Sequence, residues 1–323
     1  MPDPLVSVLI ISYNHENYIR KAIESCLMQK TSFPYEIIIH DDASTDGSAK
    51  IIQEYADKNP ELIIPILQKE NQYSKGVRIS TTLMVPIARG KFIAFCEGDD
   101  YWTDPLKLEK QVTVMDNDPS ISLCFTATKW VYVNKKKRDK IMRYHRGNYY
   151  FSSDEVIRRS GRFSDIVTTI VRKDIFNHAN TWFYLPANGD FALYLLSVLS
   201  GQTYYLDEVT AVYHRGVENS WSTKNQTSIK KSVKFFEETI NMRDEFNEYS
   251  NHRFQKAIRK QNFRELISLS FAYKDEDEFK HKYFARFTTV EKIEYFFFHK
   301  LVPLKPRFFW HRYRDLLRIL RLW

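Results

Sequence analysis

Short apolar, β-branched runs alternate with helix-like segments over the first hundred residues, and this alternation constrains the fold most. Residues 5–11 are apolar at nearly every position, which is typical of a strand buried on both faces of a parallel sheet. Similar runs predict strands at 36–40, 62–67 and 91–96, and periodic patterns predict helices at 18–29, 48–55 and 81–88. This order predicts an α/β fold with a mostly parallel central sheet flanked by helices and right-handed crossovers.

The alternation loosens after about residue 121. Strands are predicted at 122–133 and 166–171 and a helix at 191–199, whereas the apolar spacing beyond Ser222 is helical only. A chain of 323 residues is long for one domain and short for two large ones. We therefore expect an α/β domain over residues 1–222 and a C-terminal helical region over residues 223–323.

The net charge of +8 is concentrated near the C-terminus, because residues 300–323 hold seven basic side chains and one acidic one. Proteins that read nucleic acid spread basic side chains over a folded domain, so we expect no nucleic-acid partner. The three cysteines are too scattered for a disulfide framework or a zinc site, which predicts a reducing compartment. Neither a secretory signal nor a membrane-spanning stretch is expected.

Polar clusters follow the predicted strands, at the edge where open α/β sheets bind ligands. Tyr13 follows the first strand, and its ring could cap the core or stack on a base. Turn formation and helix capping account for residues 44–47 after the second strand. They do not account for the adjacent carboxylates of Asp41 and Asp42, which could accept hydrogen bonds from a nucleoside.

A third cluster places Glu97, Asp99 and Asp100 within four positions, directly after the strand at 91–96. A divalent cation would relieve their mutual repulsion, and oxygen-only ligands favour Mg²⁺ or Mn²⁺, which would bridge to phosphates. A charged surface loop is the alternative interpretation. Asp190 opens the helix predicted at 191–199, and by itself a favourable helix dipole explains it.

Together these segments resemble one family. Val-Ser-Val-Leu-Ile-Ile-Ser-Tyr-Asn, Asp-Asp-Ala-Ser-Thr-Asp-Gly, Glu-Gly-Asp-Asp-Tyr-Trp-Thr-Asp-Pro-Leu-Lys-Leu and Asn-Gly-Asp are similar, in this order and spacing, to motifs of the inverting family 2 glycosyltransferases. The resemblance covers about residues 5–222 and implies the GT-A fold, a Rossmann-like architecture. It also implies a nucleotide-sugar donor.

The resemblance implies a role for individual residues. Tyr13 matches the aromatic residue that stacks on the base, Asp42 the acid that reads the uracil, and Asp190 the catalytic base. Arg78 falls in the segment where the family often places a basic residue near the diphosphate. The pair Asp99 and Asp100 falls in the region that binds metal and sugar nucleotide.

The chain also departs from the family pattern. Glu97 stands where the first acid of the Asp-x-Asp motif is expected, which leaves Asp99 or Asp100 as the metal ligand. Gly189 precedes the expected base, where many members carry Glu. His214 and Arg215 lie where related enzymes often show a Tyr-Arg pair, so either could contact the diphosphate or the metal, or be an ordinary loop residue.

The implied function is an inverting transfer of a sugar from a UDP-sugar to a hydroxyl of a glycan or lipid-linked acceptor, in surface polysaccharide biosynthesis. Mn²⁺ or Mg²⁺, with Arg215 or Arg78, would stabilise the leaving diphosphate. Asp190 would deprotonate the acceptor hydroxyl. One base with no opposing nucleophile predicts a single displacement.

Two other functions fit parts of the pattern. A sugar-nucleotide-forming nucleotidyltransferase could share the sheet, but it would need a Gly-rich loop after the first strand, and residues 12–17 contain no glycine. A non-catalytic membrane-surface protein is the second alternative. Against it, Asp42, Asp99, Asp100 and Asp190 are all present.

Residues 309–323 place aromatic and aliphatic side chains near one face of a helix and most of the charged ones on the other. Such a basic amphipathic helix lies in a membrane interface more readily than it spans one. The expected partner of a tail over about 300–323 is therefore an anionic membrane surface on the cytoplasmic side. The alternative is a helix that packs on the catalytic domain or on a second subunit, in a homo-oligomer formed through the C-terminal helices.

Overall fold

The computed structural model describes residues 3–133, 137–159, 163–185, 189–217, 229–270 and 276–301. The chain divides into two compact units, Met1–Ile258 and Arg259–Trp323. The expected domain boundary at residue 222 and nearly all of the expected amphipathic tail, residues 302–323, lie outside the described residues.

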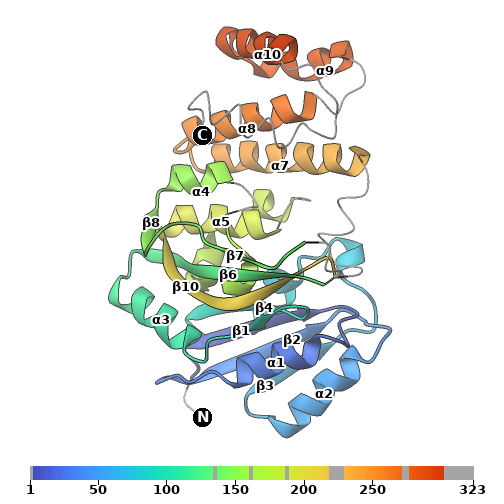
Figure 1. The fold of residues 1–323 in the computed structure, drawn as a ribbon, viewed down its shortest axis with the longest axis vertical. Coiled ribbons are helices and arrows are strands. Elements are labelled where there is room, and N and C mark those ends of the chain that lie inside the picture. Colours follow the sequence, from blue (N-terminus) through green and yellow to red (C-terminus); the bar gives the residue numbers. More distant parts are fainter. Residues whose placement is uncertain are drawn as a thin grey trace. The chain divides into compact units, whose positions relative to one another are not determined.

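The first unit is built on one ten-stranded sheet (Figure 1). Its strands are β1 (Val6–Ser12), β2 (Tyr35–Asp41), β3 (Ile63–Leu67), β4 (Phe92–Glu97), β5 (Tyr101–Trp102), β6 (Ile121–Tyr132), β7 (Lys140–Met142), β8 (Tyr149–Phe151), β9 (Ile170–Arg172) and β10 (Gln202–Arg215). They follow the order β3-β2-β1-β4-β9-β6-β10-β5, with β7 beside β6 and β8 beside β10.

The pairing of the strands determines which strand ends share an edge. β1 is parallel to β2 and β4, β2 is parallel to β3, and β6 is parallel to β10. The short strand β9 is antiparallel to both β4 and β6. The carboxyl ends of β1, β2, β4, β6 and β10 therefore lie at one edge, together with the segment that leads into β9.

Helices cover both faces of this sheet (Figure 1). One face carries α1 (Ile19–Leu27), α2 (Ser48–Lys58) and α3 (Lys107–Asn117), and the other carries α4 (Ser153–Arg159), α5 (Gly189–Ser200) and α7 (Ile229–Tyr249). Strand residues alternate between the two cores, so Ile37 and Ile39 face the first group of helices and Ile38 faces the second. Short helical turns complete the unit: η1 (Tyr73–Lys75), η2 (Ser80–Met84), η4 (Ile166–Thr168), η5 (Lys173–His178) and η6 (Thr181–Tyr184).

The expected strands and helices of the first hundred residues are present within a few residues of their predicted ends. Several elements differ, and α3, α4, β5, β7 and β8 were not predicted. The helix expected at 81–88 is the π-helical turn η2, which ends before Pro86. The first half of the strand expected at 166–171 is the turn η4, and only Ile170–Arg172 pairs as β9. The 14-residue strand β10 was not predicted from the sequence.

The second unit contains most of α8 (Gln255–Ser270), followed by α9 (Glu276–Tyr283), η7 (Phe284–Arg286) and α10 (Thr289–Leu301). Aromatic rings form its core, as in the stacked pair Phe279 and Tyr295 at 5.6 Å. An ion pair between Arg259 and Glu291 (2.9 Å) joins α8 to α10. Among the helices of the described ranges, none combines the length and the apolar character that a membrane crossing requires.

Candidate active site at the carboxyl edge of the sheet

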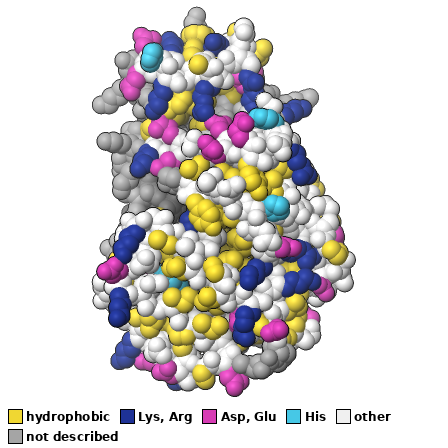
Figure 2. All heavy atoms as spheres, turned by 180° about the vertical axis from the view of Figure 1, so that it is seen from behind, with side chains coloured by type: hydrophobic (Ala, Val, Ile, Leu, Met, Phe, Trp, Pro, Cys, Tyr) yellow, Lys and Arg dark blue, Asp and Glu magenta, His cyan; other side chains and the backbone are white. Residues whose placement is uncertain are grey.

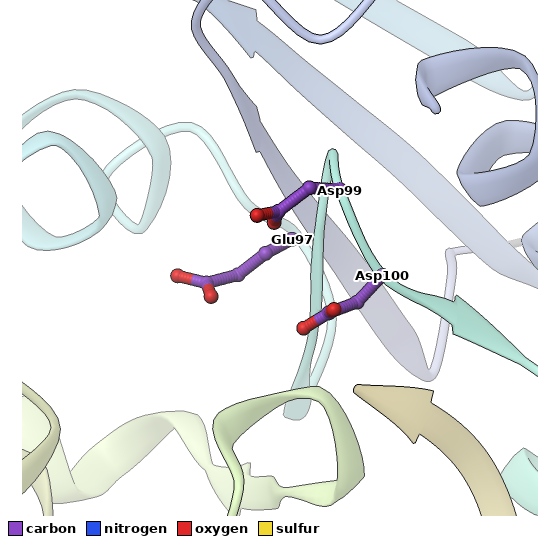
Figure 3. Close-up of side chains that lie close together, drawn as sticks. All are labelled: Glu97, Asp99 and Asp100. Carbon is purple, nitrogen blue, oxygen red and sulfur yellow. The ribbon is translucent and has the colours of Figure 1, made fainter. Parts of the chain in front are cut away.

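The carboxylates of Glu97, Asp99 and Asp100 converge where β4 ends. One ligand oxygen from each lies within 4.8 Å of the other two, and the side chains project to the same side of the β4–β5 turn (Figure 3). Asp99 is 7% exposed and Asp100 1% exposed, and the Asp100 Oδ2 atom is buried without a hydrogen-bond partner in the described chain. An all-oxygen donor set with an unpaired buried oxygen fits Mg²⁺ or Mn²⁺.

Crowding changes the proton affinity of this cluster. Burial, with the negative charges of Asp99 and Asp190, raises the pKa of Glu97 well above its usual value. Burial, with the charges of Asp99 and Glu97, does the same to the pKa of Asp100. A divalent cation would stabilise the ionised forms of both carboxylates and so reverse these shifts.

His214, near the end of β10, contacts the same turn. Its backbone N–H donates to Asp100 Oδ1 (2.8 Å), and its ring Nδ1 lies 2.5 Å from the carbonyl oxygen of Asp99. Because a carbonyl only accepts, Nδ1 carries a proton in this contact. The predicted residue His214 therefore lies at the carboxylate cluster.

Asp190 lies in the first turn of α5, across the edge from the carboxylate cluster. Burial and the negative charge of Asp165 raise its pKa to about 6, and the positive charge of Arg78 acts in the opposite direction. The Arg78 guanidinium donates to the carbonyl of Leu185 through Nη2 (2.6 Å). Its Nη1 lies 3.0 Å from the position that a Cβ on Gly189 would take. The predicted residue Arg78 is thus beside the expected base, and the glycine makes room for it.

Asp165, which precedes η4, is a further carboxylate at this edge and was missed in the sequence. The indole N–H of Trp130 (2.7 Å) and the hydroxyl of Tyr144 (2.9 Å) both donate to its Oδ2. Its charge raises the pKa values of both Asp190 and Asp100, in each case after burial as the largest cause. Asp165 belongs to none of the motifs recognised in the sequence. It reaches the site because the antiparallel strand β9 returns the chain to this edge of the sheet.

Arg215, the last residue of β10, lies over Trp130, with 4.7 Å between the guanidinium carbon and the ring centroid. Its positive charge opposes the effect of burial on the pKa of Asp165. The structure therefore places the predicted residue Arg215 on the Asp165 side of the site.

Two loops at the carboxyl ends of β1 and β2 are joined by side-chain hydrogen bonds. The backbone N–H of Asn14 donates to Ser44 Oγ (2.9 Å), and the N–H of Thr45 donates to Asn14 Oδ1 (2.8 Å). The Ser44 hydroxyl in turn donates to Asp41 Oδ1 (2.6 Å). Asn14 has a left-handed backbone with φ of 56°, which Asn tolerates better than most residues. The Asp-Asp-Ala-Ser-Thr-Asp-Gly segment thus has a structural role in shaping the β1 loop.

Asp42 is buried, with 1% of its surface exposed. The backbone N–H groups of Gln72 and Tyr73 donate to its Oδ1 (2.7 Å) and Oδ2 (3.0 Å). Its carboxylate therefore holds the turn before η1, and each oxygen retains a second lone pair. Tyr13 lies half-buried after the end of β1.

Comparison with known proteins identifies relatives along most of this chain. The family model "Glycosyl transferase family 2" matches residues 7–178. The uncharacterized protein Rv1520 of Mycobacterium tuberculosis is 35% identical over 227 residues, which are 67% of this chain and 60% of that protein. This chain thus aligns with about three-fifths of that relative's length. The Escherichia coli enzyme WfaP, a UDP-Glc:alpha-D-GlcNAc-diphosphoundecaprenol beta-1,3-glucosyltransferase, is 37% identical over 114 residues, 35% of this chain and 42% of the enzyme.

Solved structures share the fold at low sequence identity. S. aureus TarS 1–349 in complex with UDP has a TM-score of 0.56 and 17% identity, covering 90% of this chain and 77% of that one. The mannosyltransferase PcManGT of Pyrobaculum calidifontis, in complex with GDP-Man and Mn²⁺, has a TM-score of 0.55 and 12% identity, covering 99% and 88%. With the family model matching more than half of its residues, the chain belongs to glycosyl transferase family 2 and has the GT-A fold.

Proposed function

We propose that this chain transfers a sugar from a UDP-sugar to a hydroxyl group of a glycan or lipid-linked acceptor, with inversion and with the help of Mn²⁺ or Mg²⁺. The observation that carries the proposal is the convergence of the cluster Glu97, Asp99 and Asp100 with Asp190 at one edge of the sheet, close enough for Asp190 to raise the pKa of Glu97. The cluster of Glu97, Asp99 and Asp100 can hold a cation, while the carboxylate of Asp190 remains available to the acceptor.

The cation would be held by Asp99 and Asp100, with Glu97 as a further ligand, and His214 would support this cluster through its contacts with Asp99 and Asp100. When bound, it stabilises the negative charge that develops on the departing diphosphate. Tyr13 would stack on the base, and Asp42 would accept from the uracil N–H through a free lone pair. Arg215 and Arg78 are the guanidinium groups available near the transferred sugar and diphosphate.

Asp190 would accept the proton of the attacking hydroxyl as general base. With its pKa raised to about 6 by burial, it is ionised at neutral pH and is a stronger base than an ordinary aspartate. The donor nucleotide is proposed as UDP because the relative WfaP uses UDP-Glc by its name. That enzyme's diphosphoundecaprenol acceptor likewise supports a lipid-linked acceptor, surface polysaccharide biosynthesis and a peripheral location on the cytoplasmic face of the membrane.

Two variants test the two halves of the site separately. The double variant Asp99→Asn, Asp100→Asn should lose Mn²⁺-dependent UDP binding, because amides cannot neutralise the cation. Asp190→Asn should keep that binding, while kcat for sugar transfer or donor hydrolysis falls by about 10²–10⁴-fold, the usual range for loss of a general base.

Isothermal titration with UDP, with and without Mn²⁺, provides the binding values, and a panel of UDP-sugars identifies the donor. Circular dichroism and melting temperatures check that both variants are folded. Unchanged Mn²⁺-dependent UDP binding in the double variant would contradict the metal site. If Asp190→Asn loses donor binding but keeps its turnover per bound donor, then Asp190 is a binding residue and the assigned base is wrong.

A further inference from the structure

His15 lies against the carboxylate cluster although no motif assigns it a role. Its Nε2 is 3.9 Å from Asp99 Oδ2, and the two side chains are 15% and 10% exposed. Among the described residues, no other side chain lies within ion-pair or hydrogen-bond distance of the Asp99 carboxylate. In the described part of the chain, the imidazole is therefore the only side chain within this distance that can donate a proton to the Asp99 carboxylate.

The position of His15 is fixed from two directions. Its backbone N–H donates to Ser48 Oγ (2.9 Å) at the start of α2, and its carbonyl accepts from the N–H groups of Tyr18 and Ile19 (both 2.8 Å) at the start of α1. The neighbouring Glu16 N–H donates to Asp46 Oδ2 (3.1 Å). Both helices and both strand-end loops thus hold the histidine in place.

Gly98 allows the imidazole to approach. A Cβ at Gly98 would lie 2.8 Å from His15 Nδ1 and 3.0 Å from the backbone oxygen of Ile11, closer than such contacts allow. The Nδ1 atom is itself buried without a hydrogen-bond partner in the described ranges. The ring approaches Asp99 through its Nε2 atom.

His15 is not itself part of the ligand cluster, because the group of mutually close ligand atoms contains only Glu97, Asp99 and Asp100 among the described residues. Side chains that contact a ligand from outside orient it and tune the affinity for the metal. At 3.9 Å the contact between His15 Nε2 and Asp99 Oδ2 is longer than a hydrogen bond, so the two atoms must approach further when the cation binds, as contacts in catalytic sites often do in the complex.

We propose that His15 is a positioning residue that holds the Asp99 carboxylate, through Nε2–H, in the orientation that binds the divalent cation. This proposal rests on the proposed function, since it assigns a partner to the same metal site. It also gives a function to the hydrogen bonds between the Tyr-Asn-His-Glu loop and the Ser44–Ser48 segment. These bonds hold the His15 imidazole beside Gly98, where the lack of a side chain leaves room for the ring. The expected consequence is a change in metal affinity without a change in metal-free nucleotide binding.

The experiment compares His15→Leu and His15→Gln with the wild-type chain. Free Mn²⁺ is measured by electron paramagnetic resonance during titration, with the protein alone and at saturating UDP. His15→Leu should bind Mn²⁺ about 10–100-fold more weakly, the range typical of an outer partner of a metal ligand. His15→Gln carries a donor amide of similar reach and should recover most of this loss.

His178→Leu is the matched control, because it makes the same substitution at an exposed histidine and should bind Mn²⁺ like the wild type. Unchanged Mn²⁺ affinity in His15→Leu would overturn the proposal. It would also fail if either variant lowered the UDP affinity in EDTA, because the histidine would then serve nucleotide binding. A similar fall in melting temperature in both variants would show that the histidine serves folding. Absence of Mn²⁺ binding by the wild type would instead overturn the metal-assisted function itself, and this inference with it.

Discussion

At the scale of single residues, two opposing effects set the pKa of Asp190, the expected base. Burial and the charge of Asp165 raise the pKa of Asp190, whereas Arg78 lowers it. Arg78 is itself partly buried, and burial lowers its pKa, against the charge of Asp190. A Cβ at Gly189 would lie 3.0 Å from Arg78 Nη1, so a larger residue there would require the guanidinium to shift. The glycine thus leaves room for a positive charge next to the base.

This balance predicts the acid limb of the pH–rate profile. A general base works only when ionised, so kcat/KM should fall as the pH drops through about 6, the pKa to which burial raises Asp190. A bound cation can only lower that value. Arg78→Gln removes the nearby positive charge and should move the limb upward by roughly 1–3 pH units.

The measurement is kcat/KM for donor turnover at constant Mn²⁺ between about pH 4.5 and 10, a range that covers the limb near 6 and its expected upward shift by roughly 1–3 units. Arg78→Lys is the control, because it keeps the charge and should leave the limb near its wild-type position. An unmoved limb in Arg78→Gln would show that Arg78 does not act on the proton affinity of the base.

At the scale of secondary-structure elements, the residues after the carboxylate cluster connect α3 to the turn η4. The indole N–H of Trp102 donates to the carbonyl of Val167 (2.8 Å), and Gln111 Nε2 donates to the carbonyl of Thr168 (3.0 Å). Lys107, with no exposed surface, donates to Gln111 Oε1 (2.7 Å). The Tyr-Trp-Thr-Asp-Pro-Leu-Lys-Leu block, which runs into the first turn of α3, therefore helps to hold η4, the turn that follows Asp165.

Lys107 makes the stability of the fold depend on pH. Burial lowers its pKa to about 8, while the unfolded chain keeps the proton up to a pH near 10.4. Between these values the unfolded state binds more protons, so the free energy of unfolding from this group rises with pH, by at most about 1.4 kcal/mol per pH unit. Lys107→Met should lack this contribution.

Urea unfolding of both chains is measured at about pH 7.5, 8.5 and 9.5, which together span roughly 2 units across the lowered pKa. The result is the difference between the two chains in how steeply the free energy of unfolding rises with pH. Groups remote from Lys107 titrate alike in both chains and cancel in the comparison. Cys96 and Cys124, whose pKa values burial raises and the charge of Lys107 lowers, are replaced by Ala in both chains. Equal slopes would show that Lys107 keeps its proton in the fold and that its pKa is not lowered.

At the scale of the whole molecule, charge is distributed unequally between the two units. Residues 259–323 hold 15 basic and 8 acidic side chains, so they carry +7 of the net +8. On the face seen in Figure 2, Lys and Arg side chains are interspersed with Asp and Glu. The excess of basic residues is thus a property of the C-terminal segment of the sequence, where the amphipathic pattern at 309–323 also lies.

This distribution predicts binding to anionic membranes through the tail. Each Lys or Arg near an anionic leaflet contributes about 1 kcal/mol, and the apolar face adds to it. The full chain should sediment with vesicles containing phosphatidylglycerol at low salt, and a chain ending at Val302 should not. A chain with Arg312, Arg314, Arg318 and Arg321 replaced by Gln should bind more weakly.

Neutral phosphatidylcholine vesicles provide the control for charge. Membrane binding by the tail is contradicted if the shortened chain binds anionic vesicles as well as the full chain does. It is also contradicted if the full chain does not bind them, and in either case the tail packs on protein. Sedimentation equilibrium of both chains then shows whether that protein is a second copy.

The sequence by itself determined the first four strands, their parallel order and the family, because buried β-branched runs and strand-end motifs are local patterns. It also pointed to Asp99, Asp100, Asp190 and His214, which lie at one edge of the sheet in the structure. Their roles in binding and catalysis remain predictions.

Only the tertiary structure decided which side chains surround these residues. Asp165 reaches the edge because β9 is antiparallel to β4, and His15 reaches Asp99 because Gly98 leaves a gap. The unpredicted strand β10 presents His214 and Arg215 because it pairs with β6, about 80 residues earlier in the chain. Contacts between residues far apart in the chain leave no local pattern of hydrophobicity or spacing, so packing of the folded sheet alone brings them together.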